Sequence, residues 1–93
     1  MKALAEAEIQ KRLQSLDGWE YNNNAIHTAF EFENFKEAFT IMTRIAFEAE
    51  KQDHHPDWSN VYNQLHISLY THSENGVTEK DLELAETINH LVS

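Results

Sequence analysis

The feature that most constrains the fold is an apolar stripe with helical spacing in the middle of the chain, closed by the only proline. The stripe consists of Phe35, Ala38, Phe39, Met42, Ile45, Ala46 and Ala49. Asn34, with Glu37 three residues later, resembles a capping box, and Pro56 disfavours helical backbone at the residue before it. The pattern predicts an amphipathic helix over residues 35–52 that packs its apolar face on another layer.

Two more apolar residues, Ile41 and Phe47, fall on the flanks of this stripe. Either the helix is buried over a wider face within one subunit, or these two side chains form a subunit contact. The sequence leaves both interpretations open.

Alternating patterns typical of half-buried strands stand on both sides of the helix. Residues 19–32 predict two strands around a turn at Asn22–Asn24. Residues 59–72 predict one strand, or two short strands broken near Asn63. The inward side chains of the two regions are Ile26, Thr28, Phe30, Phe32, Val61, Leu65, Ile67 and Leu69.

Helices are predicted at both ends of the chain. Residues 4–16 have helical spacing and stop at Asp17–Gly18, and Thr78 with Asp81 gives a second capping-box-like start. The order α-β-β-α-β-β-α predicts an α+β fold, a four-stranded, mainly antiparallel sheet with helices on one face. The other face of the sheet is then exposed to solvent, binds a ligand or is covered by a partner.

Size and composition narrow the class of protein. With 93 residues, residues 1–93 are expected to form a single domain, whose thin core is often supplemented by oligomerisation. The net charge of −9 disfavours direct nucleic-acid binding. No cysteine is present for disulfides or thiolate sites. Without a signal-peptide core or a run of about 18 apolar residues, we expect a cytoplasmic protein that does not enter membranes.

Side chains capable of acid–base or metal chemistry are concentrated in residues 50–58, EKQDHHPDW, where the central helix has to end. A histidine at a helix C-terminus followed by a proline is ordinary, but this does not explain two histidines, His54 and His55, or Trp58 beyond them. His72 ends a predicted strand, and a hairpin-like return after Pro56 would bring it close to the other two. Imidazoles both give and take protons near neutral pH.

Two carboxylates accompany these histidines. Glu50 lies four residues before His54, so on an unbroken helix the two are neighbours, although such a pair is also common on surfaces. Asp81 has an equally ordinary explanation as a residue of a helix start. The remaining histidines, His27, His66 and His90, are expected at the surface, with His66 solvated or at an interface.

Two kinds of chemistry compete for His54, His55 and His72. Three imidazoles suit zinc, but adjacent histidines in an extended segment point apart, which makes a shared ion awkward. An acid–base site suits divergent histidines, because one can act on the substrate while its neighbour binds it.

The spacing of these residues resembles the signature of the pterin-4a-carbinolamine dehydratase family. The matching positions are Glu50, His54-His55-Pro56, Tyr62, His72 and Asp81, and the similarity extends over about residues 16 to 90. The resemblance implies dehydration of 4a-hydroxytetrahydropterin to quinonoid dihydropterin, in tetrahydrobiopterin recycling, without cofactor or metal.

The resemblance also implies roles for residues. His54, His55 and His72 carry over as catalytic, and Glu50 and Asp81 as supporting carboxylates. We favour His54 and His72 for proton transfer and His55 for holding the pterin, with the assignment of acid and base left open. The segments that contact the pterin carry over as His54–Pro56 and Thr71–Glu74 (Thr71, His72, Ser73, Glu74), with Trp58 and Tyr62 as possible walls.

Finally, the resemblance implies partners. Family members form homodimers or homotetramers through the long helix and sheet edges, which would use Ile41 and Phe47. Some animal members are dimerisation partners of a homeodomain transcription factor. A non-catalytic interaction module is therefore the alternative to the enzyme, and a metal-dependent enzyme is a third hypothesis.

Overall fold

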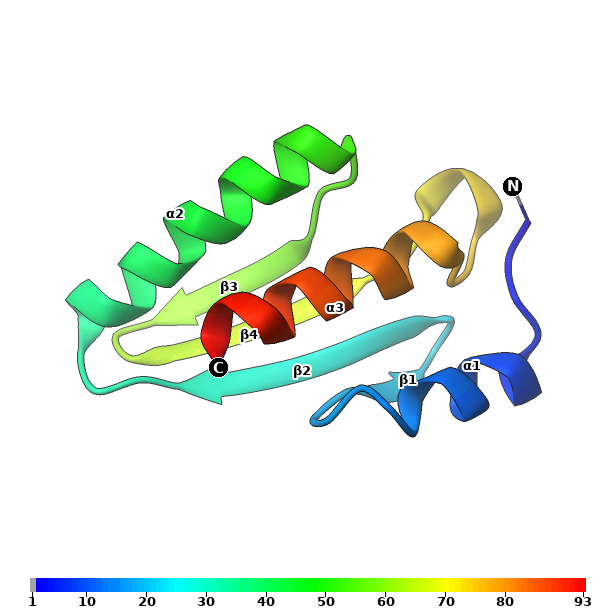
Figure 1. Cartoon of the computed structure of the whole chain (residues 1–93), viewed down its shortest axis with the longest axis horizontal. Helices are drawn as coiled ribbons and strands as arrows, with labels where there is room; N and C mark the ends of the chain where they lie inside the picture. The colour runs from blue at the N-terminus through cyan, green and yellow to red at the C-terminus, as the bar shows by residue number, and fades with distance from the viewer. Residues whose placement is uncertain (1) are drawn as a thin grey trace.

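The computed structural model describes residues 2–93 and has the element order α-β-β-α-β-β-α (Figure 1). The elements are α1 Glu6–Leu13, β1 Glu20–Asn22, β2 Ala25–Glu31, α2 Phe35–Gln52, β3 Asp57–Val61, β4 Gln64–Leu69, the short 3-10 helix η1 His72–Glu74, and α3 Glu79–Val92. The predicted α+β class is confirmed.

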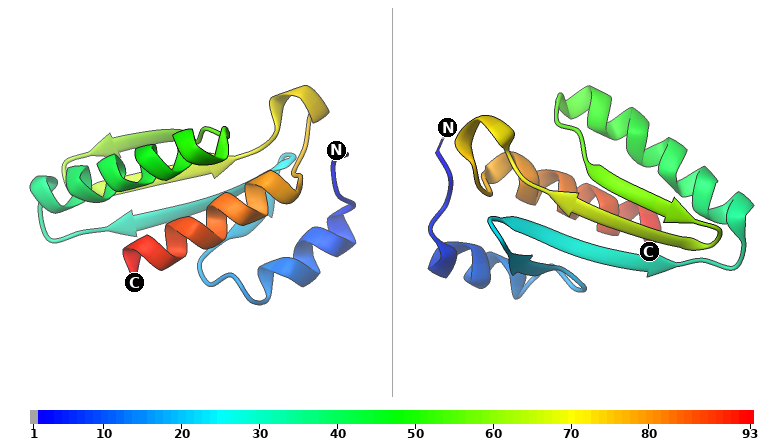
Figure 2. Two further views of the ribbon diagram at one scale, coloured as in Figure 1. Left: turned by 45° about the horizontal axis from the view of Figure 1, so that its top comes forward. Right: turned by 180° about the vertical axis from the view of Figure 1, so that it is seen from behind.

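The four strands form one antiparallel sheet in the order β1-β2-β4-β3. Helices α2 and α3 lie side by side over one face, and the view from behind shows the other face uncovered (Figure 2). The core lies between these two layers. Its fully buried large side chains include Ile26, Leu65, Ile67 and Leu69 from the sheet and Ile45, Leu84 and Ile88 from the helices.

Local backbone signals set the hairpins as expected. Asn23 and Asn24 both have positive φ and join β1 to β2, a conformation that asparagine tolerates. The second strand region breaks at Tyr62, which also has positive φ, so β3 and β4 are separate strands. The prediction that Val61 points inward is wrong. Val61 pairs with the exposed Gln64 and is itself 73% exposed, because the turn resets the alternation.

The central helix is confirmed over Phe35–Gln52, and the Asn34 side chain accepts a hydrogen bond from the Glu37 N–H at 2.9 Å. Only one line of its stripe packs inward, comprising Ala38, Met42, Ile45 and Ala49. The parallel line of Phe35, Phe39 and Ala46 is exposed, contrary to the prediction of a fully packed stripe. Helical spacing defined a face wider than the area that the sheet and α3 cover.

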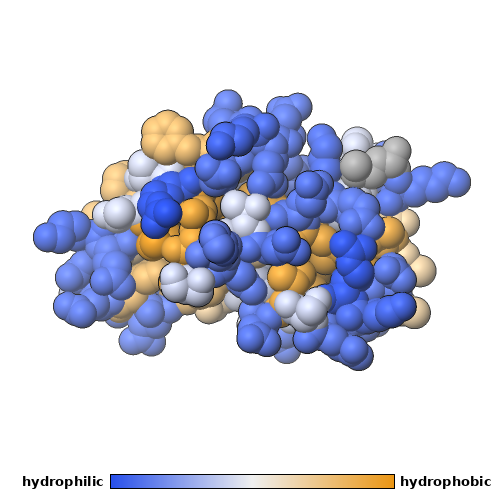
Figure 3. Space-filling model, viewed as in Figure 1, coloured by the Kyte–Doolittle hydropathy of each residue, from blue (hydrophilic) through white to orange (hydrophobic). Residues whose placement is uncertain are grey.

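The two flanking residues of α2 differ. Ile41 packs against the core of its own subunit, whereas Phe47 is 71% exposed. Hydrophobic side chains accordingly reach the surface over α2 on the helical side of the molecule (Figure 3).

The first helix, Glu6–Leu13, is shorter than the predicted range of 4–16. Residues 14–18 form turns, so the helix ends before the predicted residue. Ala5 provides no side-chain cap at its start, and the Leu4 N–H donates to the Val77 carbonyl at 2.7 Å. None of the helices among the described residues has the length and apolar content that a membrane crossing needs.

Replacing Ile45 with alanine should lower the free energy of unfolding by about 2–5 kcal/mol, because it removes a fully buried side chain between the helix and the sheet. The neighbouring Arg44→Ala, on the exposed side of α2, should change it by less than about 0.5 kcal/mol. Urea unfolding measures both. Equal effects of the two changes would contradict this description of the core.

Candidate functional site

The predicted site is built around the end of α2. Asp53 adopts a left-handed conformation (φ 54°, ψ 44°), and the His54 N–H closes the helix on the Ala49 carbonyl at 3.0 Å. The chain then runs without regular secondary structure through His55 and Pro56 into β3. Asp53 therefore ends the helix before His54, so the i,i+4 geometry expected for Glu50 and His54 does not form. That prediction is wrong, and each histidine instead pairs with a different carboxylate.

His54 faces the interior and is hydrogen-bonded through Nε2 to Oδ1 of Asp81. The Asp81 side chain has no exposed surface, and that of His54 is only 11% exposed. Asp81 belongs to the first turn of α3, 27 residues away in the sequence. This contact joins the end of α2 to the start of α3.

The other oxygen of Asp81 is equally well bonded. Its Oδ2 accepts from the Thr78 N–H at 2.8 Å and from the Thr71 hydroxyl at 2.8 Å. The predicted capping box at Thr78 and Asp81 is confirmed, and the hydroxyls of Thr71 and Thr78 are 2.7 Å apart. A buried carboxylate needs such partners, because an unpaired charge in the interior is costly.

His55 has a contrasting environment. Its Nε2 lies 2.7 Å from Oε2 of Glu50, and the two side chains are 58% and 76% exposed. One histidine is thus fixed inside the molecule while its neighbour lies at the surface, so the two side chains diverge as expected.

The Thr71–Glu74 segment lies between β4 and α3. His72 was expected to end a strand, which is wrong, because β4 ends at Leu69 and His72 begins η1. Its exposed ring is 6.3 Å from that of Tyr70, centroid to centroid. The end of α2, η1 and the start of α3 lie at the same end of the molecule (Figure 1). Convergence of the three imidazoles stays a prediction.

The other predicted site residues are spread more widely. Pro56 and Trp58 are half-buried, and Trp58 pairs with Ile67 of β4 and packs on the core. Ser73 and Glu74 are exposed in η1. Tyr62 is 61% exposed and follows β3, at the opposite end of the strand from His55.

The remaining histidines behave differently from one another. His66 and His90 are exposed, as expected. His27, expected at the surface without a partner, is half-buried, with Nδ1 2.7 Å from the Ser68 hydroxyl and Nε2 2.9 Å from the Asn22 carbonyl. The strand register brings these groups together, which the sequence pattern did not reveal.

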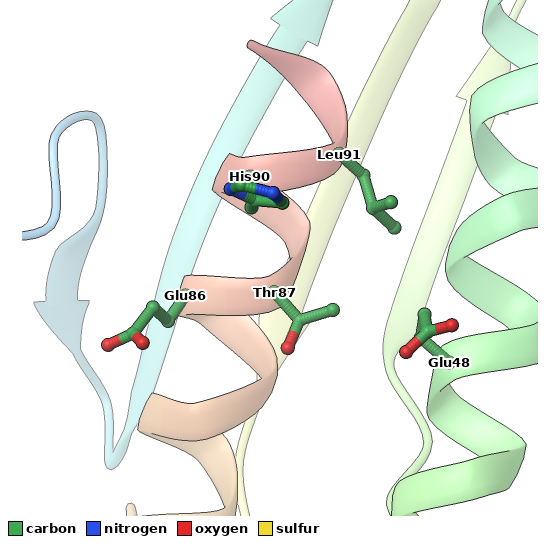
Figure 4. A pocket seen from close by; sticks show the side chains of 5 residues that line it. All are labelled: Glu48, Glu86, Thr87, His90 and Leu91. Atoms are coloured by element: carbon green, nitrogen blue, oxygen red, sulfur yellow. The ribbon is translucent and has the colours of Figure 1, made fainter.

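An open groove between α2 and α3 has a volume of about 440 Å³ and contains none of the predicted site residues (Figure 4). It is lined by Glu48, Glu86, Thr87, His90 and Leu91. Within residues 2–93, no three histidine, aspartate or glutamate side chains form a group that could hold a metal ion.

A bidentate ion pair links α1 to the start of α3. Arg12 donates from Nη1 and Nη2 to the two carboxylate oxygens of Glu79 at 2.8 and 2.9 Å. This hydrogen bonding lowers the pKa of Glu79 and raises the pKa of Arg12.

The lowered pKa of Glu79 predicts a pH effect. The pair adds stability above the unfolded pKa of a glutamate, and this stability is lost as the pH falls through the folded pKa. Glu79→Gln should therefore lower the stability slightly at pH 7, and by less in acid. Exposed Glu83→Gln is the control, and melting temperatures across pH provide the measurement. An equal loss at all pH values would contradict the prediction.

The chain matches the model of a protein family described as Pterin 4 alpha carbinolamine dehydratase over residues 2–91. A protein of Christiangramia forsetii, named as a candidate pterin-4-alpha-carbinolamine dehydratase, is 62% identical over 92 residues, which cover 99% of this chain and 95% of that protein. A relative of the same name from a Chelativorans species is 50% identical, and the match covers 92% of this chain and 90% of that protein.

The fold is also similar to a solved one. The crystal structure of a "transcriptional coactivator/pterin dehydratase" from Brucella melitensis matches with a TM-score of 0.96 and 44% identity. The match covers 99% of this chain and 100% of that one.

Proposed function

The chain belongs to the pterin-4a-carbinolamine dehydratase family, and from this premise we propose that it converts 4a-hydroxytetrahydropterin to quinonoid dihydropterin and water. The reaction would serve tetrahydrobiopterin recycling, and we propose that the protein acts in the cytoplasm. The observation that carries the proposal is the pair of differently held histidines at the end of α2, in a chain 62% identical to a relative named for this activity.

The chemistry asks for two proton transfers. A general acid protonates the departing 4a-hydroxyl, so that the C4a–O bond breaks and water leaves, and a general base takes a proton from the ring system. We assign these transfers to His54 and His72, and the holding of the pterin mainly to His55.

Asp81 and Glu50 support this proposal. A carboxylate hydrogen-bonded to an imidazole orients the ring. Asp81 does this for His54 from a buried, fully bonded position, and Glu50 for His55 at the surface. We propose His54–Pro56, Trp58 and Thr71–Glu74 as pterin-contacting residues, and no cofactor or metal.

The purified protein should accelerate the loss of 4a-hydroxytetrahydropterin over buffer, and a chelator should leave the rate unchanged, because histidines perform the proton transfers. Ultraviolet absorbance follows the conversion to dihydropterin. No acceleration would refute the enzymatic assignment, and loss of activity with chelator, restored by zinc, would favour the metal-dependent alternative.

His54→Ala and His72→Ala should each lower the rate by about 10²-fold or more, the usual contribution of a general acid or base. His66→Ala is a matched control, because His66 is exposed on β4 and outside the proposed site. Near-wild-type rates in the first two variants would contradict their roles.

We also propose that the chain forms a homodimer or homotetramer. Phe35, Phe39 and Phe47 expose apolar surface on α2. β3 is an edge strand whose last residue, Val61, is also exposed. Exposed edges and apolar patches favour association with a second chain.

Phe39→Glu combined with Phe47→Glu should reduce the solution mass, because the change would place two charges in the proposed contact. These positions test the contact better than Ile41, which packs on its own core. Gln10→Glu, at an exposed position on α1, is the control. Light scattering measures the mass. An unchanged assembly in the double variant would rule this interface out.

A protein-interaction module is the second candidate function. It is favoured by the name of the similar solved structure, which describes that protein as a transcriptional coactivator as well as a pterin dehydratase. A transcription-factor partner would be expected to use the exposed side of α2, without direct contact to nucleic acid. Such a module needs no histidine site, so the dehydration assay separates the two candidates.

A further inference from the structure

We propose that the hydroxyls of Thr71 and Thr78 fix the tautomer of His54, so that it carries a proton on Nε2, toward Asp81, and presents Nδ1 to the substrate. The two threonines are then positioning residues for the proton-transfer step. The part that concerns the substrate rests on the proposed function, whereas the tautomer follows from hydrogen-bond geometry alone.

The carboxylate of Asp81 is the centre of this hydrogen-bond network. It lies in the first turn of α3, where the helix dipole favours an anion. Oδ2 also accepts from the Thr78 N–H, which can only donate. A carboxylate accepts hydrogen bonds and cannot donate them, and the Thr71 hydroxyl and the Thr78 N–H are both donors to it.

Because the carboxylate of Asp81 accepts, the direction of each hydroxyl's hydrogen bond is fixed. The Thr71 hydroxyl has a single proton and donates it to Oδ2 of Asp81. The Thr78 hydroxyl, 2.7 Å away, therefore donates to Thr71, while it accepts from the Lys80 N–H at 3.3 Å. The chain of donors runs from Thr78 through Thr71 to the carboxylate.

The carboxylate also determines which nitrogen of the His54 imidazole carries the proton. Because Oδ1 of Asp81 accepts, Nε2 of His54 is the protonated nitrogen of the neutral ring. Nδ1 has no hydrogen bond within residues 2–93. Because no buried side-chain nitrogen or oxygen among these residues lacks a partner, Nδ1 reaches solvent. His54 then exchanges protons with the substrate through Nδ1, as base when that nitrogen is bare and as acid when it is protonated.

The tautomer is measured without substrate, by long-range ¹H–¹⁵N spectra of protein labelled with ¹⁵N at its imidazole nitrogens. The spectra are recorded at a pH high enough for the imidazoles to be neutral. The His54 signals are assigned by their loss in His54→Gln. We expect a protonated Nε2 and a bare Nδ1. A proton on Nδ1, or an equal mixture of the two tautomers, would overturn the inference.

Variants test the role of the hydroxyls. Thr71→Val removes one donor to the carboxylate, so the His54 signals should shift toward a mixture of tautomers and the rate should fall about 10-fold, the scale of one charge-assisted hydrogen bond. Thr71→Ser should restore both. Thr87→Val is the matched control. The Thr87 hydroxyl lies farther along α3, where it accepts from the Gln52 side chain and donates to the Glu83 carbonyl.

The two readouts separate the possible failures. Thr71 is also a proposed pterin contact, so a lower rate with an unchanged His54 spectrum would overturn the positioning role and leave Thr71 as a binding residue. An inactive wild-type protein would overturn the proposed function. The wild-type spectrum alone decides the tautomer, even if Thr71→Val does not fold.

Discussion

The candidate site depends on the hydrogen bonds of one buried carboxylate, that of Asp81. It caps α3, bonds the loop after β4 through Thr71, and holds His54 at the end of α2. The end of α2, the loop after β4 and the start of α3 are thereby joined at one end of the molecule. A buried charge is tolerated there because both oxygens are hydrogen-bonded, so the structural demand of the carboxylate and the orientation of the histidine are met by the same contacts.

The end of α2 adds the second constraint. A left-handed Asp53 ends the helix, and in the segment that follows His54 points inward and His55 outward. The two imidazoles therefore differ in exposure and in partner, although they are neighbours in the chain. This difference suits a division between proton transfer and substrate holding, which is the basis of the proposed mechanism.

Much of the fold could be predicted because its signals are local. The turn at the Asn22–Asn24 run, the cap at Asn34 and the capping box at Thr78 all depend on residues within three or four positions of one another. What could not be predicted depends on packing. Helical spacing alone did not show that Phe35 and Phe39 would remain uncovered, since that depends on what lies beside α2.

The site shows the same division. Its histidines and carboxylates were recognisable from their spacing, but their pairing was not. One left-handed residue, Asp53, moved His54 off the helical line, and only the tertiary fold brought Asp81 to it. Thr78 was predicted as a cap, whereas its contact with Thr71 was missed. The Thr-x-x-Asp spacing of residues 78–81 was the available signal for a buried carboxylate at this place.

The most direct test of the central claim is a crystal structure of the protein with a bound dihydropterin. We predict that the pterin ring lies at the end of α2, with a ring atom within about 3 Å of Nδ1 of His54 and with His55 and His72 both in contact with the pterin. A pterin bound elsewhere, for example in the groove between α2 and α3, or one that approaches His54 from its Asp81 side, would contradict it.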